Sequence, residues 1–306
     1  YNYEGYNRIK VKNLESTCKS ESFYSDIFKV KMFEEKHFHF PGVFNSELQC
    51  ADYNNDNFLD ILITGDDTTA IYTNTGQDSF IRLEITLPRI AEASGAWADF
   101  DNDNLIDFAI SGIKRIDSSI IFQIYHNEGN GIFTLEKTNI NGLYSGFVKW
   151  VDLNNDGQLE LIISGIDANY QAQTKIIKRV DLKFVESKSD IENLKFSSAS
   201  FGDYNNDGYL DLLVSGNNGS SRICKIYKNE SGNLKEIQTE LLGIENGSAE
   251  WADFNNDGYL DLTISGYKND PIITYNGSGY SADFRLAACL DFHQNYFLDS
   301  FPLVLK

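Results

Sequence analysis

A cluster of acidic residues recurs along the chain, and this repeat limits the fold more than any other feature. The cluster reads D-x-[DN]-x-D-[GN]-x-x-[DE] and begins at Asp52, Asp99, Asp152, Asp203 and Asp253. Successive copies are 47, 53, 51 and 50 residues apart. A period near 50 is typical of one supersecondary unit in an array whose neighbouring units share a continuous core. The 306 residues therefore favour one repeat domain over two separate domains.

The segments between the clusters have the pattern of β-strands. In the fourth repeat, residues 210–216, 224–230, 233–241 and 248–254 are short runs rich in apolar and β-branched residues, separated by Gly, Asn and Ser. No segment shows sustained helical periodicity. Each repeat therefore predicts four antiparallel strands, and four-stranded units arranged radially form a β-propeller.

The two ends of the chain predict how such an array closes. Residues 8–16 and 26–35 resemble the third and fourth strands of a unit, and a degraded sixth cluster begins at Asp291. We expect a single all-β propeller domain over residues 1–306, with six four-stranded blades. Residues 45–286 would form five full blades, each with one acidic cluster, while residues 1–44 and 287–306 would supply the two halves of the closing blade. Seven blades remain an alternative if residues 1–44 form more than two strands.

One position of the repeat predicts how the blades pack together. Two residues before the leading acids stand Cys50, Trp97, Trp150, Phe201, Trp251 and Cys289. We expect the aromatic members to pack between neighbouring blades. Cys50 stands at this position in the first blade and Cys289 in the closing blade. A disulfide between them would therefore link these two blades where the propeller closes. A pair of buried thiols is the alternative.

The acidic clusters have the spacing of a calcium-binding loop. Oxygen-bearing residues at positions 1, 3, 5 and 9, with a backbone carbonyl at position 7, match the shell of about six to eight oxygens that Ca²⁺ prefers. Gly or Asn at position 6 predicts a left-handed turn, and the apolar residue at position 8 is expected to pin the loop to the core. A metal-free turn is the alternative, but five copies with acids at the same offsets favour calcium. The usual EF-hand is excluded because its position-12 Glu is missing.

These offsets predict about five bound Ca²⁺ ions. The candidate ligands are Asp52, Asn54, Asp56, Phe58 and Asp60; Asp99, Asp101, Asp103, Leu105 and Asp107; Asp152, Asn154, Asp156, Gln158 and Glu160; Asp203, Asn205, Asp207, Tyr209 and Asp211; and Asp253, Asn255, Asp257, Tyr259 and Asp261. The sixth cluster has only two carboxylates, so we expect it to be empty or weak. The five loops hold 16 carboxylates that would repel one another without metal, so calcium removal should destabilise the fold.

With these loops the chain resembles the FG-GAP/VCBS repeat family, whose blades also occur in integrin α-subunit propellers and in some fungal propeller lectins. The resemblance rests on DxNxDGxLD-type loops followed by strands that end in Ser-Gly or Thr-Gly, and it covers nearly the whole chain. The triplet FGD occurs only at residues 201–203, and the other copies read WAD, WVD or CAD. The resemblance implies an extracellular, calcium-stabilised propeller used for adhesion or glycan binding. It does not specify the ligand.

Charge and calcium use restrict the partner and the compartment. The formal charge of -19 argues against nucleic acid or anionic lipid as the main partner. No apolar stretch approaches the length of a membrane span. Numerous calcium loops suit compartments with millimolar calcium. Sequons at Asn218, Asn229, Asn246 and Asn276 would be glycan acceptors in a secreting eukaryote. Both observations predict a secreted or cell-surface location.

The variable loops predict where a ligand binds. The connections from second to third strands and from fourth to first strands would lie on the face opposite the calcium loops, and they differ between copies. The candidate contacts there are Arg115, Tyr144, Tyr170 and Tyr267. Because these loops repeat no pocket motif, we favour a non-catalytic protein-binding scaffold over the alternative, a glycan-binding lectin. An enzyme such as a polysaccharide lyase or hydrolase is disfavoured, since no distinctive acid–base pair or nucleophile motif stands out.

Overall fold

The structure is a computed structural model that describes residues 38, 40–43, 45–253, 257–268, 285–290 and 297–298. For residues 268, 285–290 and 297–298 only the backbone is described. The chain divides into two units, Tyr1–Pro41 and Gly42–Lys306. The predicted strands at 8–16 and 26–35 lie outside the described residues, so the closing blade stays a prediction.

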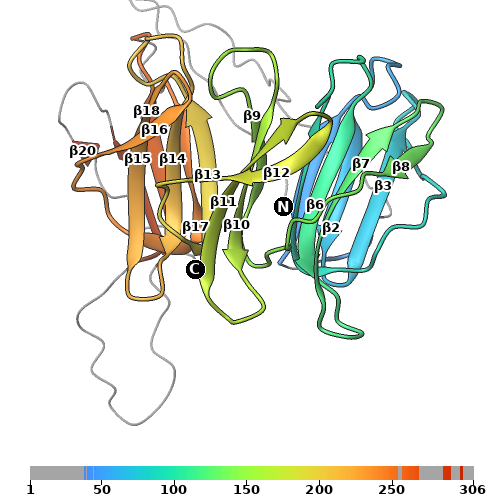
Figure 1. Cartoon of the computed structure of the whole chain (residues 1–306), viewed down its shortest axis with the longest axis horizontal. Helices are drawn as coiled ribbons and strands as arrows, with labels where there is room; N and C mark the ends of the chain where they lie inside the picture. Colours follow the sequence, from blue (N-terminus) through green and yellow to red (C-terminus); the bar gives the residue numbers. More distant parts are fainter. Residues whose placement is uncertain are drawn as a thin grey trace, which may run out of the picture. The chain divides into compact units, whose positions relative to one another are not determined.

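The second unit contains strands and turns, but no α-helix, over its described residues (Figure 1). The strands form antiparallel sheets whose order follows the chain. The first sheet comprises β1 (Glu47–Ala51), β2 (Asp60–Gly65), β3 (Thr68–Asn74) and β4 (Phe80–Arg82); the second, β5 (Ala91–Ala98), β6 (Asp107–Ile113), β7 (Ile120–Asn127) and β8 (Phe133–Leu135); and the third, β9 (Val148–Val151), β10 (Glu160–Ile166), β11 (Ala172–Val180) and β12 (Lys183–Ser187). The predicted all-β class and four-stranded unit are confirmed here. No membrane-spanning helix occurs in this part of the chain.

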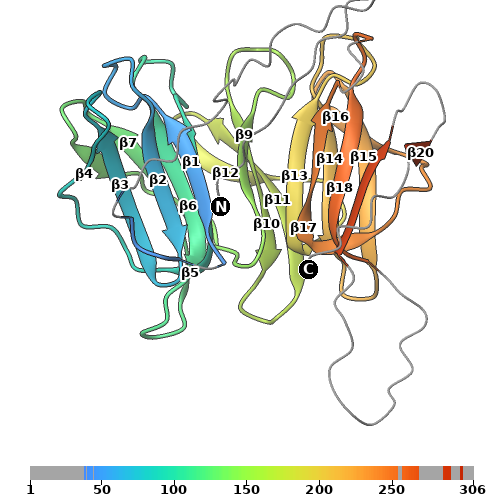
Figure 2. The same cartoon turned by 180° about the vertical axis from the view of Figure 1, so that it is seen from behind.

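The remaining strands form one eight-stranded sheet. Its members are β13 (Lys195–Gly202), β14 (Asp211–Asn217), β15 (Arg222–Glu230), β16 (Asn233–Ile237), β17 (Ile244–Ala252), β18 (Asp261–Lys268), β19 (Arg285–Leu290) and β20 (Phe297–Leu298). β15 and β17 share a single residue pair, Ile223 with Ile244. We therefore treat β13–β16 as the fourth sheet and β17–β20 as the fifth. In Figure 2, β17 and β18 lie beside β13 and β14, in agreement with the extensive β13–β17 contact.

The place of β19 corrects one expectation. Residues 287–306 were predicted to begin a closing blade, but β19 pairs antiparallel with β18 and β20 pairs with β19. Residues 287–290 therefore occupy the third position of the fifth sheet. A short apolar run fits a third strand as well as a first strand, so composition does not distinguish the two positions.

Aromatic stacking joins consecutive sheets, as the sequence predicted. Trp97 stacks on Tyr53 of the preceding sheet's loop with ring centroids 6.0 Å apart. Trp150 stacks on Phe100 at 5.9 Å, and Trp251 stacks on Tyr204 at 5.7 Å. The second strands between these contacts are almost fully buried. The core therefore lies between neighbouring sheets and continues from one repeat to the next.

A bulge near the start of each first strand explains the recurring Ser-Gly or Thr-Gly. Seven residues before each leading acid the backbone is left-handed, with φ between 46° and 57°, at Asn45, Glu92, Ser145, Phe196 and Asn246. The register of β5, β13 and β17 shifts at this point. The glycine that ends the dipeptide faces the bulge: a Cβ at Gly165 would lie 2.4 Å from the carbonyl oxygen of Tyr144. The bulge therefore needs glycine on the second strand.

Candidate functional site

Each acidic loop joins the first strand of a sheet to the second and is wrapped around its own carboxylates. In the fourth loop, Asp203 accepts backbone hydrogen bonds from Asp207 at 3.0 Å and from Gly208 at 2.8 Å. The carboxylate of Asp207 in turn accepts from the N–H of Tyr209 at 3.1 Å. The same three bonds recur in the other four loops. The same backbone hydrogen bonds therefore fix the carboxylates at positions 1 and 5 in every copy.

Position 6 is left-handed, as predicted. The φ angle is 69° at Asn57 and Asn104 and between 83° and 89° at the three glycines of the other loops. The expectation for position 8 is wrong in two loops, because the side chains of Leu59 and Leu210 are 60% and 38% exposed. The loop is anchored one residue later, by the acid at position 9.

The acid at position 9 is the buried end of each loop. Asp107 accepts hydrogen bonds from the N–H groups of Phe100 at 3.1 Å and Asn127 at 2.7 Å. Burial raises the pKa of Asp107 to about 7 and that of Asp60 and Asp211 to about 6. Desolvation disfavours a charged carboxylate, so a cation beside these groups would favour their ionised form.

The second loop gives the clearest test of whether calcium fits. Asp99, Asp101 and Asp107 each place a carboxylate oxygen within 4.8 Å of the others. Among the described residues, Oδ1 of Asp101 is buried and has no hydrogen-bond partner. An all-oxygen set of converging carboxylates with a free acceptor suits a hard cation. The predicted ligands therefore fit calcium here, and the other four loops share this frame, although Asn255 lies outside the described residues.

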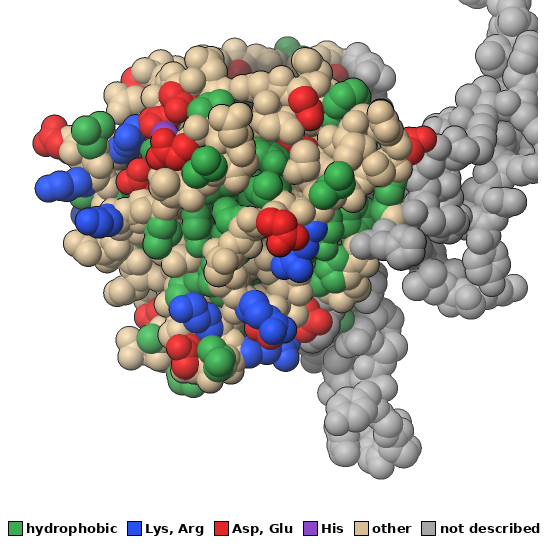
Figure 3. Space-filling model, turned by 90° about the vertical axis from the view of Figure 1, so that its right-hand side faces the viewer, with side chains coloured by type: hydrophobic (Ala, Val, Ile, Leu, Met, Phe, Trp, Pro, Cys, Tyr) green, Lys and Arg blue, Asp and Glu red, His purple; other side chains and the backbone are tan. Residues whose placement is uncertain are grey.

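Basic side chains from the third strands reach three of the loops, and sequence reasoning missed them. The Nε2 atom of His126 lies 3.2 Å from Asp101, and the ammonium groups of Lys178 and Lys228 lie 3.3 Å from Glu160 and Asp207. Figure 3 shows a histidine among acidic side chains, and His126 is the sole histidine of the described part. The three basic residues stand at the same place in the third strand of their sheets. Each follows directly after the residue that pairs with the second strand just past the position-9 acid, which is Tyr125, Ile177 or Tyr227. The recurrence of a basic residue at this place in the repeat is the sequence signal that could have indicated these contacts.

Asparagine side chains tie each loop to the next one. The residue at position 4 is Asn in all five loops, and in the first four loops its amide donates to the position-6 carbonyl of the following loop. The N···O distances are 2.9 Å from Asn55, 2.8 Å from Asn102, 2.8 Å from Asn155 and 3.4 Å from Asn206. All four asparagines are left-handed, with φ from 57° to 63°. The recurrence of Asn at position 4 could have indicated this role.

The structure brings together two of the four predicted ligand contacts. Tyr170 is 78% exposed in the β10–β11 turn, and Tyr144 pairs through its backbone with Ile166 at the start of that turn. Burial raises the pKa of Tyr144, and the neighbouring Glu92, Tyr170 and Asp167 raise it further. Arg115 instead pairs with Asp66 of the preceding sheet at 3.2 Å. Tyr267 lies within β18, half-buried.

The predicted disulfide stays a prediction. Cys50 is exposed and carries a free thiol in the structure. The backbone of Cys289 pairs with Thr263, but its side chain lies outside the described residues.

Comparison with known proteins agrees with this geometry. Residues 52–110 and 203–264 match the model of the FG-GAP-like repeat, and no curated protein matches the sequence. A solved structure described as the "structural basis of specific recognition of non-reducing terminal N-acetylglucosamine" by an Agrocybe aegerita lectin is similar, with a TM-score of 0.51 and 17% identity. The match covers 85% of this chain and 66% of the lectin chain. The chain thus spans just under two thirds of that protein, and at this identity the likeness concerns the fold.

Proposed function

Because the chain carries FG-GAP-like repeats, we propose that it is a calcium-stabilised, non-catalytic binding module that closes as a six-bladed propeller. The observation that carries the proposal is the common loop frame, in which the second loop gathers three carboxylates around one position. About five Ca²⁺ ions would be held by positions 1, 3, 5, 7 and 9 of the loops. Bound calcium would neutralise buried acids and thereby favour the folded chain over the unfolded chain.

Thermal unfolding with and without calcium tests this proposal. We expect the midpoint to rise by several degrees in millimolar calcium relative to excess chelator, with about five ions bound per chain. Asp101→Asn removes one charge from the second loop at constant size, so we expect it to lose about one ion and part of the shift. Asp181→Asn, in the exposed β11–β12 turn, is the matched control. Unfolding that is identical with calcium and with chelator would refute the calcium role.

Binding to a protein partner in a secreted or cell-surface assembly is the function we favour. The connections between second and third strands present different groups in successive sheets, including Asp66, Arg115 and Tyr170. Such non-repeating chemistry suits one partner that contacts several sheets at once. Calcium affinities of about 10⁻⁴–10⁻³ M are common in extracellular modules, which supports the proposed location.

Glycan binding is the second candidate, and the structural likeness to a lectin favours it. A glycan array probed in millimolar calcium, with a chelated sample beside it, separates the two candidates. Calcium-dependent binding to one sugar class would establish a lectin. A blank array from protein whose folding is verified by its calcium-dependent midpoint would favour the protein scaffold.

A further inference from the structure

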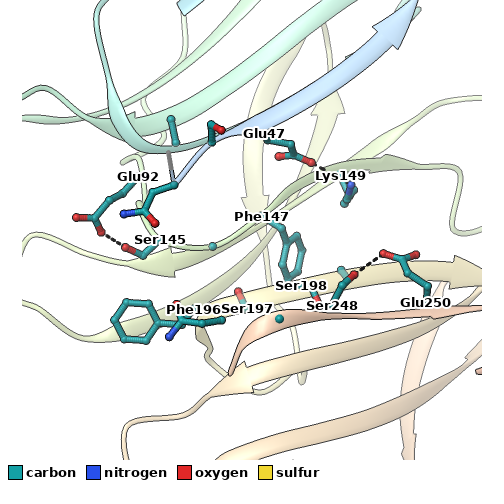
Figure 4. A pocket seen from close by; sticks show the side chains of 17 residues that line it. Glu47, Glu92, Ser145, Phe147, Lys149, Phe196, Ser197, Ser198, Ser248 and Glu250 are labelled. Atoms are coloured by element: carbon teal, nitrogen blue, oxygen red, sulfur yellow. Dashed lines mark hydrogen bonds and ion pairs between the residues drawn. The ribbon is translucent and has the colours of Figure 1, made fainter. Parts of the chain in front are cut away.

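A cavity of about 530 Å³ lies where the first strands of five successive sheets begin (Figure 4). Each first strand ends at its acidic loop, so the cavity is separate from the candidate calcium sites. All five left-handed bulge residues line it: Asn45, Glu92, Ser145, Phe196 and Asn246. The fold thus places one residue of each repeat at equivalent points around a single cavity.

The backbone around the cavity is uniform, whereas its side chains are not. The N–H of Ser145 donates to the carbonyl of Glu92 at 2.9 Å, and the N–H of Phe196 donates to the carbonyl of Ser145 at 2.6 Å. A left-handed backbone is unfavourable for residues as large as Glu and Phe, and such strain is concentrated at functional sites. The bulges therefore present an acid, a hydroxyl, an aromatic ring and two amides from one fixed frame.

The charge of the cavity is unbalanced. Of its carboxylates, Glu47 is paired with Lys149 at 3.2 Å and accepts a hydrogen bond from Ser94. Glu92 accepts from the hydroxyl of Ser145, and Glu250 accepts from the hydroxyl of Ser248 at 2.8 Å. No basic side chain among the described residues pairs with Glu92 or Glu250. Figure 4 shows these two acids on opposite sides of Phe147.

We propose that this cavity binds a basic peptide segment of the partner protein, with a lysine or arginine side chain at each of Glu92 and Glu250. The serine hydroxyls hold the two carboxylates in place, and a charge-assisted hydrogen bond to a fixed carboxylate is the strongest contact the cavity can offer. The chain's net charge of -19, which about five bound Ca²⁺ ions would reduce to about -9, would also steer a basic partner toward the protein. This inference rests on the proposed role as a protein-binding module.

Titration with short peptides tests the inference directly. The probes are peptides with two lysines separated by one to four glycines, their acetyl-lysine counterparts, and neutral N-acetylglucosamine oligosaccharides. We expect a dibasic peptide to bind, its acetylated form to fail, and affinity to fall as salt increases. The double variant Glu92→Gln with Glu250→Gln keeps side-chain size and the capacity to accept the serine hydrogen bonds. It should bind about tenfold more weakly, the equivalent of about 1.4 kcal/mol.

A matched control separates this cavity from the general acidity of the chain. Glu84→Gln with Glu240→Gln removes two exposed carboxylates that do not line the cavity, and it should leave the affinity unchanged. Equal loss in both double variants, no binding of any dibasic peptide, or displacement of the peptide by a neutral sugar would each overturn the inference. Any of these results obtained with a protein that calcium stabilises would leave the calcium role intact. Absence of stabilisation by calcium would refute that role separately.

Discussion

Asn127 shows how one buried amide connects two repeats. Its Nδ2 atom donates to the carbonyl of Tyr53 in the preceding sheet's loop at 2.9 Å and to the carbonyl of Ile106 at 3.0 Å. Its Oδ1 atom accepts from the N–H of Gly129 at 2.9 Å. Asn229 makes the equivalent bonds two sheets further on. The residue therefore satisfies backbone groups that water cannot reach.

Replacing this amide should cost more than replacing its counterpart in the first sheet. We expect Asn127→Ala to lower the free energy of unfolding by about 2–4 kcal/mol, because it leaves buried carbonyl and N–H groups without partners. Asn74→Ala is the control, since among the described residues its amide bonds only within its own sheet, and it is partly exposed. Urea unfolding of both variants measures the difference. Equal losses would show that the link between sheets adds nothing.

The same burial changes the interpretation of a sequon. Asn229 begins one of the four sequons, but in the structure its side chain is buried and Nδ2 is bonded to two carbonyls. A glycan on this nitrogen would displace both bonds. The folded chain therefore does not offer Asn229 as an acceptor, whereas Asn218 is partly exposed on a turn.

At the level of the element, the second-strand glycine and the first-strand bulge form one unit. Gly165 has φ of 149° and its missing Cβ leaves room for the backbone of Tyr144. We expect Gly165→Ala to cost about 3 kcal/mol or more, because strand β10 must move away from the bulge. Gly219→Ala, in the β14–β15 turn outside the acidic loops, is the control: φ is 95° and no atom lies within 4 Å of a Cβ there. Its cost should be about 1–2 kcal/mol from backbone strain alone.

Thermal unfolding in calcium compares the two alanine variants, and the peptide titration adds a second readout. Displacement of the bulge at Ser145 would change the cavity, so Gly165→Ala should also weaken binding of the dibasic peptide, whereas Gly219→Ala should not. Equal stability losses with unchanged peptide affinity would separate the glycine from the bulge.

The elements that the sequence predicted well are those whose signal is local. The strands, the left-handed turn at position 6 and the stacking of Trp97, Trp150 and Trp251 each follow from a residue type at a repeated offset. The bulge was missed because Glu92 and Phe196 have no intrinsic preference for left-handed φ. That conformation is set by the glycine of a different strand. The place of β19 was also missed, since strand pairing is non-local.

At the scale of the whole molecule, the asparagines at position 4 connect the calcium loops into a series. Each amide bonds to the position-6 carbonyl of the next loop, directly before the position-7 residue whose carbonyl is a predicted ligand. An ion that orders one loop would therefore favour the binding-competent form of its neighbour, which is a coupling between sites. The aromatic stacks run in parallel with these bonds and make the connection stiff.

Calcium binding should therefore be cooperative, and removal of the amides should reduce the cooperativity. We expect a calcium titration with a Hill coefficient above one, and a value closer to one in the double variant Asn102→Gly with Asn155→Gly, at an unchanged number of ions. Glycine retains the left-handed backbone, so the variants lose only the side-chain bond. Asn130→Gly is the control, because Asn130 is also left-handed and exposed but lies in the β7–β8 turn. If the double variant titrates as steeply as this control, the loops bind calcium independently, and the asparagine bonds hold the sheets together without coupling the sites.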